Sequence, residues 1–335
     1  MEGKVLLGHG SGGKLSHQLV EELFVKHFYN SKLAKLDDQA QLGSLKGRLA
    51  FSTDSFVVNP LFFPGGNIGK LAVCGTVNDV AMAGAEPKYL SAGFIIEEGF
   101  PLSKLEEIVM TMAETAKEAG VQIVTGDTKV VEKGLADGLY INTSGIGVIY
   151  PKIKTSGSMA QVGDKIIING TMGDHGIVVM AERHGISFQS PVLSDCAPLN
   201  GLVKEIIEAC PAVRVLRDPT RGGVATTLNE IAGQSNKGVI LYEEKLPIKP
   251  EIQGVCDILG LDPLYVANEG KVLTVVPSEM AEEVLSVIRK NPLGKDAEII
   301  GEVVDSHPGK VILKTLVGGS RVVDMLQGAQ LPRIC

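Results

Sequence analysis

Residues 48–84 read RLAFSTDSFVVNPLFFPGGNIGKLAVCGTVNDVAMAG, and this segment contains both kinds of element that we expect in the fold. Residues 48–58 are rich in β-branched and aromatic side chains, which predicts a strand, with an interruption at Asp54. From Gly69 to Gly84 the apolar residues recur at helical spacing, which predicts a helix. Strands that alternate with helices are typical of α/β proteins. We therefore expect a mixed α/β chain.

The segments on either side continue this alternation. Residues 14–28 carry an apolar stripe at helical spacing and follow a glycine-rich segment. Residues 102–120 have a stronger helical pattern, with Ser103 as the expected N-cap and Gly120 as the expected end. Strands are expected over 121–128, 139–150, 165–170 and 213–218, helices over 175–185, 199–210 and 222–235, and further periodic runs over 238–244, 252–260, 271–276, 280–290 and 297–304.

Residues 151–163, PKIKTSGSMAQVG, have no apolar periodicity, and their Pro, Gly, Ser and Lys content is typical of a linker between domains. At roughly 150 residues per domain, a chain of 335 residues is expected to hold two domains. We therefore expect an N-terminal glycine-rich segment and helix over 1–35, a first α/β domain over 36–150, this linker, a second α/β domain over 164–317, and a flexible tail over 318–335.

The composition excludes several classes of protein. The chain has 32 Lys and Arg against 39 Asp and Glu, a net charge of −7, with no basic block that could neutralise nucleic-acid phosphates. No apolar run approaches the ~18 residues that span a bilayer, and residues 1–13 lack the apolar core of a secretory signal. We therefore expect a cytoplasmic protein that binds neither nucleic acid nor membrane. The five cysteines form no CxxC pair, so reduced thiols are expected, with Cys74, Cys196, Cys210 and Cys256 in the core.

Four aspartates in the first half follow apolar runs: Asp38, Asp54, Asp79 and Asp127. In α/β architectures, strand ends and helix starts converge on one rim, where clustered carboxylates repel one another unless a cation such as Mg²⁺ shares them. The pattern therefore predicts a magnesium and phosphate site. Taken singly, each aspartate is more often a helix cap or a turn residue, and that alternative stays open.

Two glycine-rich loops are candidate phosphate sites. Residues 9–14, His-Gly-Ser-Gly-Gly-Lys, precede a helix whose amino end could hold phosphate oxygens, although the spacing is not that of a P-loop. Residues 217–223, Arg-Asp-Pro-Thr-Arg-Gly-Gly, also lead from a strand into a helix. On spacing alone, a phosphate loop and a well-capped structural turn are equally good interpretations of the second loop.

Cys335 follows Leu-Pro-Arg-Ile and is the last residue of the sequence. Terminal residues are usually mobile, so its thiol could move between a site on this protein and a site on a partner, with Arg333 favouring the thiolate. The alternative is a surface thiol without a role.

Seven motifs in order, HGSGG, the segment 49–84, IVTGDTKVV, GTMGDHG, RDPTRGGV, VANEGK and PRIC, span residues 8–335. Together they resemble the HypE family of hydrogenase maturation proteins, in the superfamily of aminoimidazole ribonucleotide (AIR) synthetase, selenophosphate synthetase and thiamine-monophosphate kinase. The resemblance implies a PurM-like fold with an N-terminal ATP-binding and dimerisation domain, a larger C-terminal domain, ATP and Mg²⁺ as cofactors, and a homodimer.

The resemblance also implies the reaction. A carbamoyltransferase, HypF, is expected to load a carbamoyl group onto Cys335, and the protein then dehydrates this S-carboxamide to a thiocyanate in an ATP-dependent step. The cyanide passes to iron on the HypC–HypD scaffold complex and becomes a ligand of nickel–iron hydrogenase. Two other readings remain: a related small-molecule kinase or synthetase in which Cys335 is incidental, and a thiol carrier that hydrolyses no ATP.

The family motifs imply roles for individual residues. Cys335, Glu269 and Lys129 match catalytic positions, with Glu269 as proton acceptor and Lys129 as electrostatic partner, although these two could instead form a surface ion pair with each other. Asp174 and His175 either contact nucleotide or brace their loop. The implied metal ligands are Asp38, Asp54, Asp79 and Asp127, and the implied nucleotide-binding residues are His9, Gly10, Gly12, Gly13, Asn78, Asp127, Asp218, Gly222 and Gly223.

Overall fold

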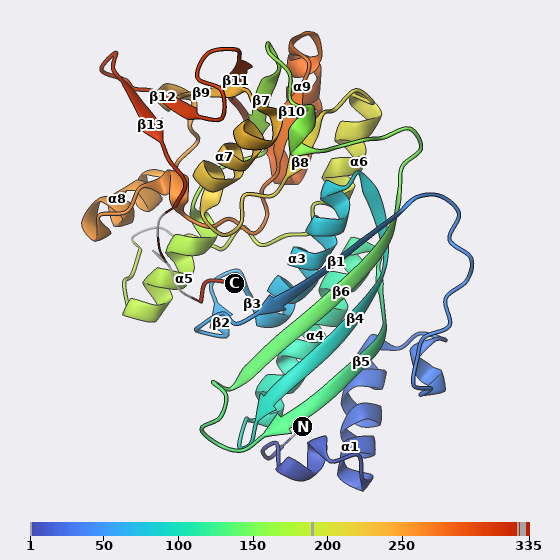
Figure 1. Ribbon diagram of the computed structural model, residues 1–335. Helices are drawn as coiled ribbons and strands as arrows, with labels where there is room; N and C mark the ends of the chain where they lie inside the picture. The colour runs from blue at the N-terminus through green and yellow to red at the C-terminus, as the bar shows by residue number, and fades with distance from the viewer. Residues whose placement is uncertain (1, 189–190, 327, 329–332) are drawn as a thin grey trace.

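The computed structural model describes residues 2–188, 191–326, 328 and 333–335. Its helices pack against two β-sheets, a four-stranded sheet from the first half of the chain and a seven-stranded sheet from the second half. The two sheets lie beside each other, and helix α3 lies where they meet (Figure 1). This arrangement confirms the mixed α/β class that the sequence predicts.

The first sheet consists, in order across it, of β1 (Leu49–Phe56), β6 (Leu139–Ile149), β4 (Ala85–Glu97) and β5 (Gln122–Val131). Neighbouring strands are antiparallel except for β4 and β5, which are parallel. The parallel pair requires a crossover, which helix α4 (Leu102–Ala119) provides. A short hairpin of β2 (Phe62–Phe63) and β3 (Gly66–Asn67) leads into α3 (Ile68–Met82). Both α3 and α4 cover the same face of the sheet (Figure 1).

Side chains alternate between the two faces of this sheet. On β1, Ala50 and Phe56 are buried on the helix side, whereas Phe51 on the other face is 72% exposed. The strand register places Ile146 of β6 and Tyr89 of β4 beside Phe51 on that outer face. The described chain therefore leaves the outer face of the first sheet uncovered and partly apolar.

The second sheet consists, in order across it, of β13 (Ser320–Val323), β12 (Val311–Lys314), β9 (Gly238–Tyr242), β11 (Glu298–Val304), β7 (Lys165–Ile168), β10 (Leu273–Val276) and β8 (Val215–Arg217). Helix α7 (Gly223–Ser235) packs on one face, and α6 (Asn200–Ala209) and α9 (Ala281–Lys290) pack on the other. Helices α5 (Asp174–His184) and α8 (Pro250–Leu259) pack against each other around a smaller apolar cluster. Only β12 and β9 are parallel neighbours.

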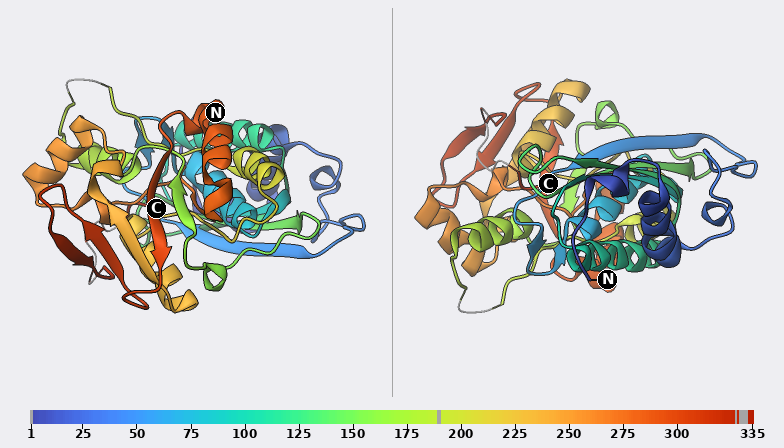
Figure 2. Two further views of the ribbon diagram at one scale, coloured as in Figure 1. Left: turned by 90° about the horizontal axis from the view of Figure 1, so that it is seen from above. Right: turned by 90° about the horizontal axis from the view of Figure 1, so that it is seen from below.

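The helix predicted over residues 14–28 is confirmed. It consists of α1 (Lys14–Leu19), a π-helical segment (Val20–Val25) and α2 (Lys26–Phe28). The buried Asn30 side chain then donates hydrogen bonds to the carbonyls of Phe28 and Ile123, which attaches the end of this helix to β5. Figure 2 shows the helix (dark blue, view from below) on the opposite side of the molecule from β12 and β13 (red).

Two local predictions are wrong. Strand β1 is not interrupted at Asp54, which pairs with Thr143 of β6 inside the ladder. Ser103 is not the N-cap of α4: the helix begins at Leu102 after Pro101, whose side chain caps nothing. Proline fits that position because its fixed φ suits a helix start, where no N–H is needed. Gly120 ends the helix as expected, with φ +70.

The end of the chain returns to the first half of the molecule. Residues 320–323 form β13 at the edge of the second sheet, which corrects the expected start of a free tail at residue 318. Ile334 is 3% exposed and packs in the core beneath the first sheet. The chain end lies near β2 and β3 (Figure 1). None of the described helices is both long enough and apolar enough to span a lipid bilayer.

Candidate functional site

Three aspartates lie within electrostatic range of one another where β1, α3 and the loop before α7 come together. Ser52 and Asp54 lie on the face of β1 that packs against α3, and the Ser52 hydroxyl donates a 2.6 Å hydrogen bond to Oδ2 of Asp79 on α3. Asp218 directly follows β8, in the loop that leads into α7. We call Asp54, Asp79 and Asp218 the acidic junction.

Burial raises the pKa values of all three carboxyl groups of the acidic junction, and repulsion among them contributes. Burial raises the pKa of Asp54, and burial together with the charge of Asp54 raises the pKa of Asp79. For Asp218, burial and the charge of Asp79 raise the pKa to about 7. Arg217 and Arg221 offset this only in part. Such carboxylates are stabilised by any cation that binds among them.

Glu269 lies beside the acidic junction, on the loop that precedes β10. The residue is 4% exposed, and its Oε1 has no hydrogen-bond partner among the described residues. Burial raises its pKa well above the usual range, and the charges of Cys196 and Asp195 add to the shift. A buried carboxyl group without a partner is a candidate for ligand contact or proton transfer.

The backbone of Glu269 is held on two sides. The buried carboxylate of Asp195 accepts hydrogen bonds from the N–H groups of Glu269 at 3.2 Å and Gly270 at 3.3 Å, and pairs with Lys271 at 3.0 Å. From α3, the Asn78 amide donates to the Glu269 carbonyl at 3.3 Å. Asn78, which the motifs suggest as a nucleotide neighbour, thus uses its amide to fix the loop that carries Glu269.

Cys335 reaches the same place from the end of the chain. Its Sγ lies 3.5 Å from Nη2 of Arg221, a residue of the loop before α7. Its carbonyl oxygen accepts a 3.2 Å hydrogen bond from the N–H of Val57, just beyond β1. Burial and the charge of Glu269 raise the thiol pKa to about 11, against the opposing effect of Arg221. The thiol, the buried carboxyl group and an arginine therefore meet at one site.

Arg333 does not act on this thiol, which corrects the sequence expectation. Its Nε donates to the carbonyl of Val57, and its guanidinium pairs with Asp137. The arginine beside the sulfur is Arg221.

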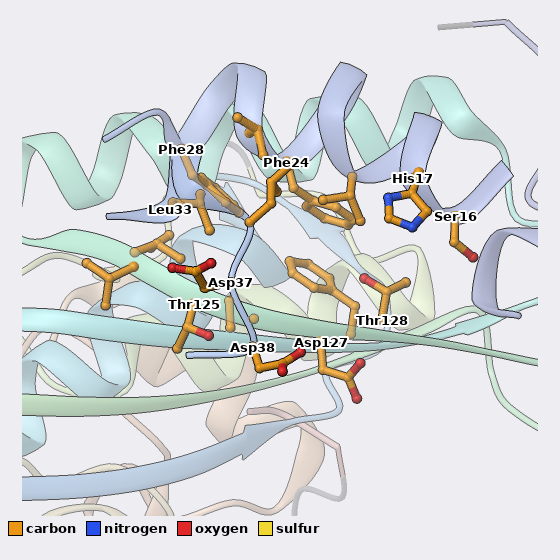
Figure 3. Close-up of a pocket in the computed structure, with 18 of the residues that line it drawn as sticks. Ser16, His17, Phe24, Phe28, Leu33, Asp37, Asp38, Thr125, Asp127 and Thr128 are labelled. Carbon is orange, nitrogen blue, oxygen red and sulfur yellow. The ribbon is translucent and has the colours of Figure 1, made fainter. Parts of the chain in front are cut away.

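A cavity of about 650 Å³ lies between the N-terminal helix and β5. Phe24 and Phe28 of the helix and Thr125 and Thr128 of β5 line it, with Asp38 and Asp127 nearby (Figure 3). Of the residues expected to bind nucleotide or metal, it is lined by His9, Gly10, Gly12, Asp38 and Asp127, and Lys129 lines it as well.

The structure does not bring the four expected metal ligands together. Asp54 faces α3, whereas the register places Asp127 in one row with Ser55 of β1, on the outer face of the same sheet. The expected rim of strand ends is therefore wrong, because Asp54 and Asp127 lie inside strands and Asp79 lies inside α3. Within the described ranges, no three His, Cys, Asp or Glu side chains are grouped as a metal site.

Lys129 and Glu269 are also apart. Lys129 pairs with Asp127 at 2.7 Å, and both side chains are largely exposed. The alternative of a surface ion pair between Lys129 and Glu269 is therefore wrong, because Glu269 is buried on the other side of the sheet.

Several of the expected phosphate-binding glycines have a backbone reason to be glycine. A Cβ on Gly10 would lie 2.6 Å from the amide nitrogen of Val130, so glycine lets this segment lie on β5. At Gly223, φ is +62 and a Cβ would lie 2.5 Å from the Leu264 carbonyl oxygen. Gly12 and Gly222 also have positive φ, whereas Gly13 borders open space. Their nucleotide contacts stay a prediction.

Sequence reasoning did not assign Arg221 and Asp195 to the site. It also did not predict that His175 contacts the chain end. Arg221 and His175 stand in quoted motifs, but only the fold shows which groups they contact. Asp195 had no such signal. Asp174, next to His175, pairs with Lys249 at 2.7 Å and accepts a 2.6 Å hydrogen bond from Thr171, so it braces its loop.

Two family models match most of the chain. The AIR synthase related N-terminal domain matches residues 36–149, and the AIR synthase related C-terminal domain matches residues 161–314. The chain therefore belongs to the class of AIR synthase related proteins, which have the PurM-like fold.

Nearer relatives narrow this class. The chain is 52% identical over 333 residues to the carbamoyl dehydratase HypE of Azotobacter vinelandii, covering 99% of this chain and 98% of that one. A crystal structure of the hydrogenase maturation protein HypE in complex with ATP superposes with a TM-score of 0.96 at 51% identity, covering 98% of this chain and 99% of that one. HypE in a crystal structure of a HypE–HypF complex superposes with a TM-score of 0.81 at 53% identity, covering 92% of this chain and 99% of that one. The chain belongs to the HypE family of carbamoyl dehydratases, enzymes of hydrogenase maturation.

Proposed function

We propose that this enzyme uses ATP to dehydrate an S-carboxamide on its own Cys335 to a thiocyanate, the source of cyanide for the iron of nickel–iron hydrogenase. The observation that carries the proposal is the position of the Cys335 sulfur, 3.5 Å from Arg221 and beside the buried Glu269. This position brings together the thiol, a proton acceptor and a positive charge, the three groups that the proposed reaction uses.

The proposed chemistry explains why a phosphoryl donor is needed. An amide oxygen leaves poorly, so transfer of the γ-phosphoryl group to the carboxamide oxygen converts it into a phosphate leaving group. Two protons leave the nitrogen, the C–O bond breaks with release of phosphate, and the carbon–nitrogen triple bond forms. Glu269 is the proposed proton acceptor, since burial makes its carboxylate a stronger base once it is ionised. Arg221 is placed to hold the charge that develops on the transferred group.

ATP and Mg²⁺ are the proposed cofactors. The acidic junction supplies hard oxygen donors with unbalanced negative charge, which fits a divalent cation that also binds phosphate oxygens. Asp54 and Asp79 would hold Mg²⁺, whose bound charge would neutralise the phosphates. For Asp38, Asp127 and Lys129, the supporting observation is the cavity that they line, which is large enough for part of a nucleotide and contains His9, Gly10 and Gly12. Lys129 is then proposed as an electrostatic partner of the nucleotide.

Three partners are part of the proposal. HypF would load the carbamoyl group, and the HypE–HypF complex of a relative supports this partner. The HypC–HypD complex would receive the cyanide. A second copy of this chain would cover the outer face of the first sheet, where Leu49 is 50%, Phe51 72% and Ile95 45% exposed. Large apolar side chains exposed on an uncovered sheet face favour an interface between subunits.

The proposal is tested by a single turnover. The protein is loaded with HypF and a carbamoyl donor, separated from HypF, and mixed with Mg²⁺ and ATP, and the ADP formed is measured. We expect one ADP per loaded chain and none above background for Cys335→Ser, with Cys210→Ser as the control that retains turnover. Equal ADP formation by Cys335→Ser on addition of a free acceptor would favour a small-molecule kinase. A loaded chain that forms no ADP would favour a thiol carrier.

A further inference from the structure

The last three residues of the chain lie beside residues 57–59, and Arg333 has a left-handed backbone conformation with φ +56. The N–H of Val57 donates to the Cys335 carbonyl at 3.2 Å, and the N–H of Asn59 donates to the Arg333 carbonyl at 3.1 Å. Alternate N–H groups of residues 57–59 thus bind main-chain oxygens of the chain end, so this contact does not depend on the side chains of residues 333 and 335.

Helix α5 holds the other side of the same segment. Nε2 of His175 lies 2.9 Å from the Ile334 carbonyl oxygen, and Nη2 of Arg183 donates to the Arg333 carbonyl at 2.8 Å. Arg183 also donates from Nε to the Asn59 carbonyl at 2.8 Å, so it joins the two sides. All three carbonyl groups of residues 333–335 therefore accept hydrogen bonds from fixed groups of the protein.

The hydrogen bonds around His175 define its tautomer. A carbonyl oxygen can only accept, so Nε2 carries the proton that points to Ile334. The opposite nitrogen, Nδ1, therefore accepts a 2.8 Å hydrogen bond from the Ser194 hydroxyl. The oxygen of this hydroxyl in turn accepts from the N–H of Cys196 at 3.1 Å. The imidazole is fully buried and its edge contacts the ring of Phe63 at a centroid distance of 5.3 Å. His175 is thus a rigid donor aimed at the chain end.

We propose that His175 and Arg183 are positioning residues that, with the backbone of Val57 and Asn59, form a dock for the main chain of residues 333–335. The dock binds three main-chain oxygens and the buried Ile334 side chain, whereas the hydrogen bond that the structure describes for the Cys335 sulfur comes from Arg221, outside the dock. It therefore accepts the free thiol, the carboxamide and the thiocyanate alike. This use of the dock rests on the proposed function, whereas the dock itself does not.

Two substitutions at His175 separate docking from simple burial. The terminal amide of Gln reaches about as far as Nε2, so His175→Gln keeps a donor for Ile334, whereas the amide of Asn matches Nδ1 and keeps only the Ser194 contact. If His175 merely stabilised the core through Ser194, Asn would be the milder change. If it docks the chain end, Gln would be the milder change.

The first readout uses no ATP and no partner. The alkylation rate of Cys335 in the full chain is measured with iodoacetamide, and the modified cysteine is identified by peptide mass spectrometry. We expect His175→Asn to be alkylated about 5- to 10-fold faster than wild type, because the docked state loses one hydrogen bond. For His175→Gln we expect an increase in rate of less than about 2-fold. Arg183→Met, at a partly exposed position that does not risk the core, should also accelerate alkylation, while the neighbouring His184→Asn should not.

The second readout follows water loss from the carbamoyl-loaded protein. His175→Asn should slow this step at saturating ATP by a similar factor with the KM for ATP unchanged, and His175→Gln should retain most of the rate. Alkylation rates that are equal in all variants, or fastest in His175→Gln, would overturn the dock even if the wild type dehydrates normally. If the wild type loses no water while the alkylation order holds, the dock stands and the proposed function fails.

Discussion

Glu269 carries a buried carboxyl group whose pKa is raised by burial and by the acidic and thiol groups around it, although Arg221 also lies within electrostatic range. Its pKa in the folded protein lies well above its value in the unfolded chain, so the folded state binds the extra proton. Stability therefore falls as the pH rises above the unfolded value near 4.3, until the folded value is passed.

Replacing Glu269 with Gln should remove this dependence. We expect Glu269→Gln to become more stable relative to wild type as the pH rises from about 5 to about 8. The difference in unfolding free energy should grow by up to about 1.4 kcal/mol per pH unit, and the difference in melting temperature should grow with it. Thermal unfolding of both proteins across this range without nucleotide provides the measurement. A difference that does not change with pH would mean that Glu269 is ionised and compensated in the folded state.

Asp218 predicts a second pH effect in the same direction. Because burial and the charge of Asp79 raise its pKa from 3.8 to about 7, the folded state loses stability as the pH rises between these two values. Asp218→Asn should therefore stabilise the nucleotide-free protein by about 4 kcal/mol more at pH 8 than at pH 4. The same variant should lose part of the stabilisation that Mg²⁺ and ATP give the wild type. Urea unfolding with and without ligand tests both effects, and a destabilised apo variant would count against the acidic junction.

The sequence identified most of the residues of this site but not their arrangement. Asp54, Asp79, Asp218, Glu269 and Cys335 each stood in a recognisable motif, and the structure brings them near one another. That Asp127 points to the opposite face from Asp54 could not be predicted, because the alternation of a strand fixes a face only once its register is known.

Helix α3 connects the two halves of the site through Asn78. Its amide donates to the carbonyls of Ala197 and Glu269 and accepts from the N–H of Leu199, all buried. Asn78→Ala should therefore destabilise the protein by about 2–3 kcal/mol in urea unfolding, because buried backbone groups lose their partner. If Asn78→Ala is as stable as wild type and only binds ATP more weakly, Asn78 instead binds nucleotide, as the motif suggests.

Elements with a strong period were predictable, and those without one were not. The helix at 102–119 has a continuous apolar stripe, whereas β4, the longest strand, was not predicted from the sequence. Pro87 lies between the charged residues Glu86 and Lys88 at its start, and a register shift there disturbs the alternation. The hairpin of β12 and β13 is short, and only its pairing with β9 makes it part of a sheet.

Within the part of the chain that the structure describes, one face of the first sheet is uncovered, and a second copy of the chain is the proposed occupant. Phe51→Lys should then shift the protein from dimer to monomer in analytical ultracentrifugation, because a charge would be buried in an apolar interface. Val317→Lys, at a residue that is 95% exposed on the second half, should leave the dimer intact. A wild-type protein that sediments as a monomer would rule out this interface.

The position of the chain end was also beyond sequence reasoning, because it depends on contacts between residues far apart in the chain. The pattern predicts a free tail, and the structure instead docks residues 333–335 between Val57, Asn59 and α5. Under the proposed function, loading by a partner would require the segment to leave the dock, and dehydration would require it to return.

The central claim is tested most directly by intact-mass spectrometry of the full chain, followed by peptide mapping. After incubation with HypF and a carbamoyl donor, a carbamoyl adduct should appear on Cys335, and addition of Mg²⁺ and ATP should then remove the mass of one water from that adduct. An adduct on Cys74, Cys196, Cys210 or Cys256, or a carbamoylated Cys335 that loses no water when Mg²⁺ and ATP are present, would contradict the account.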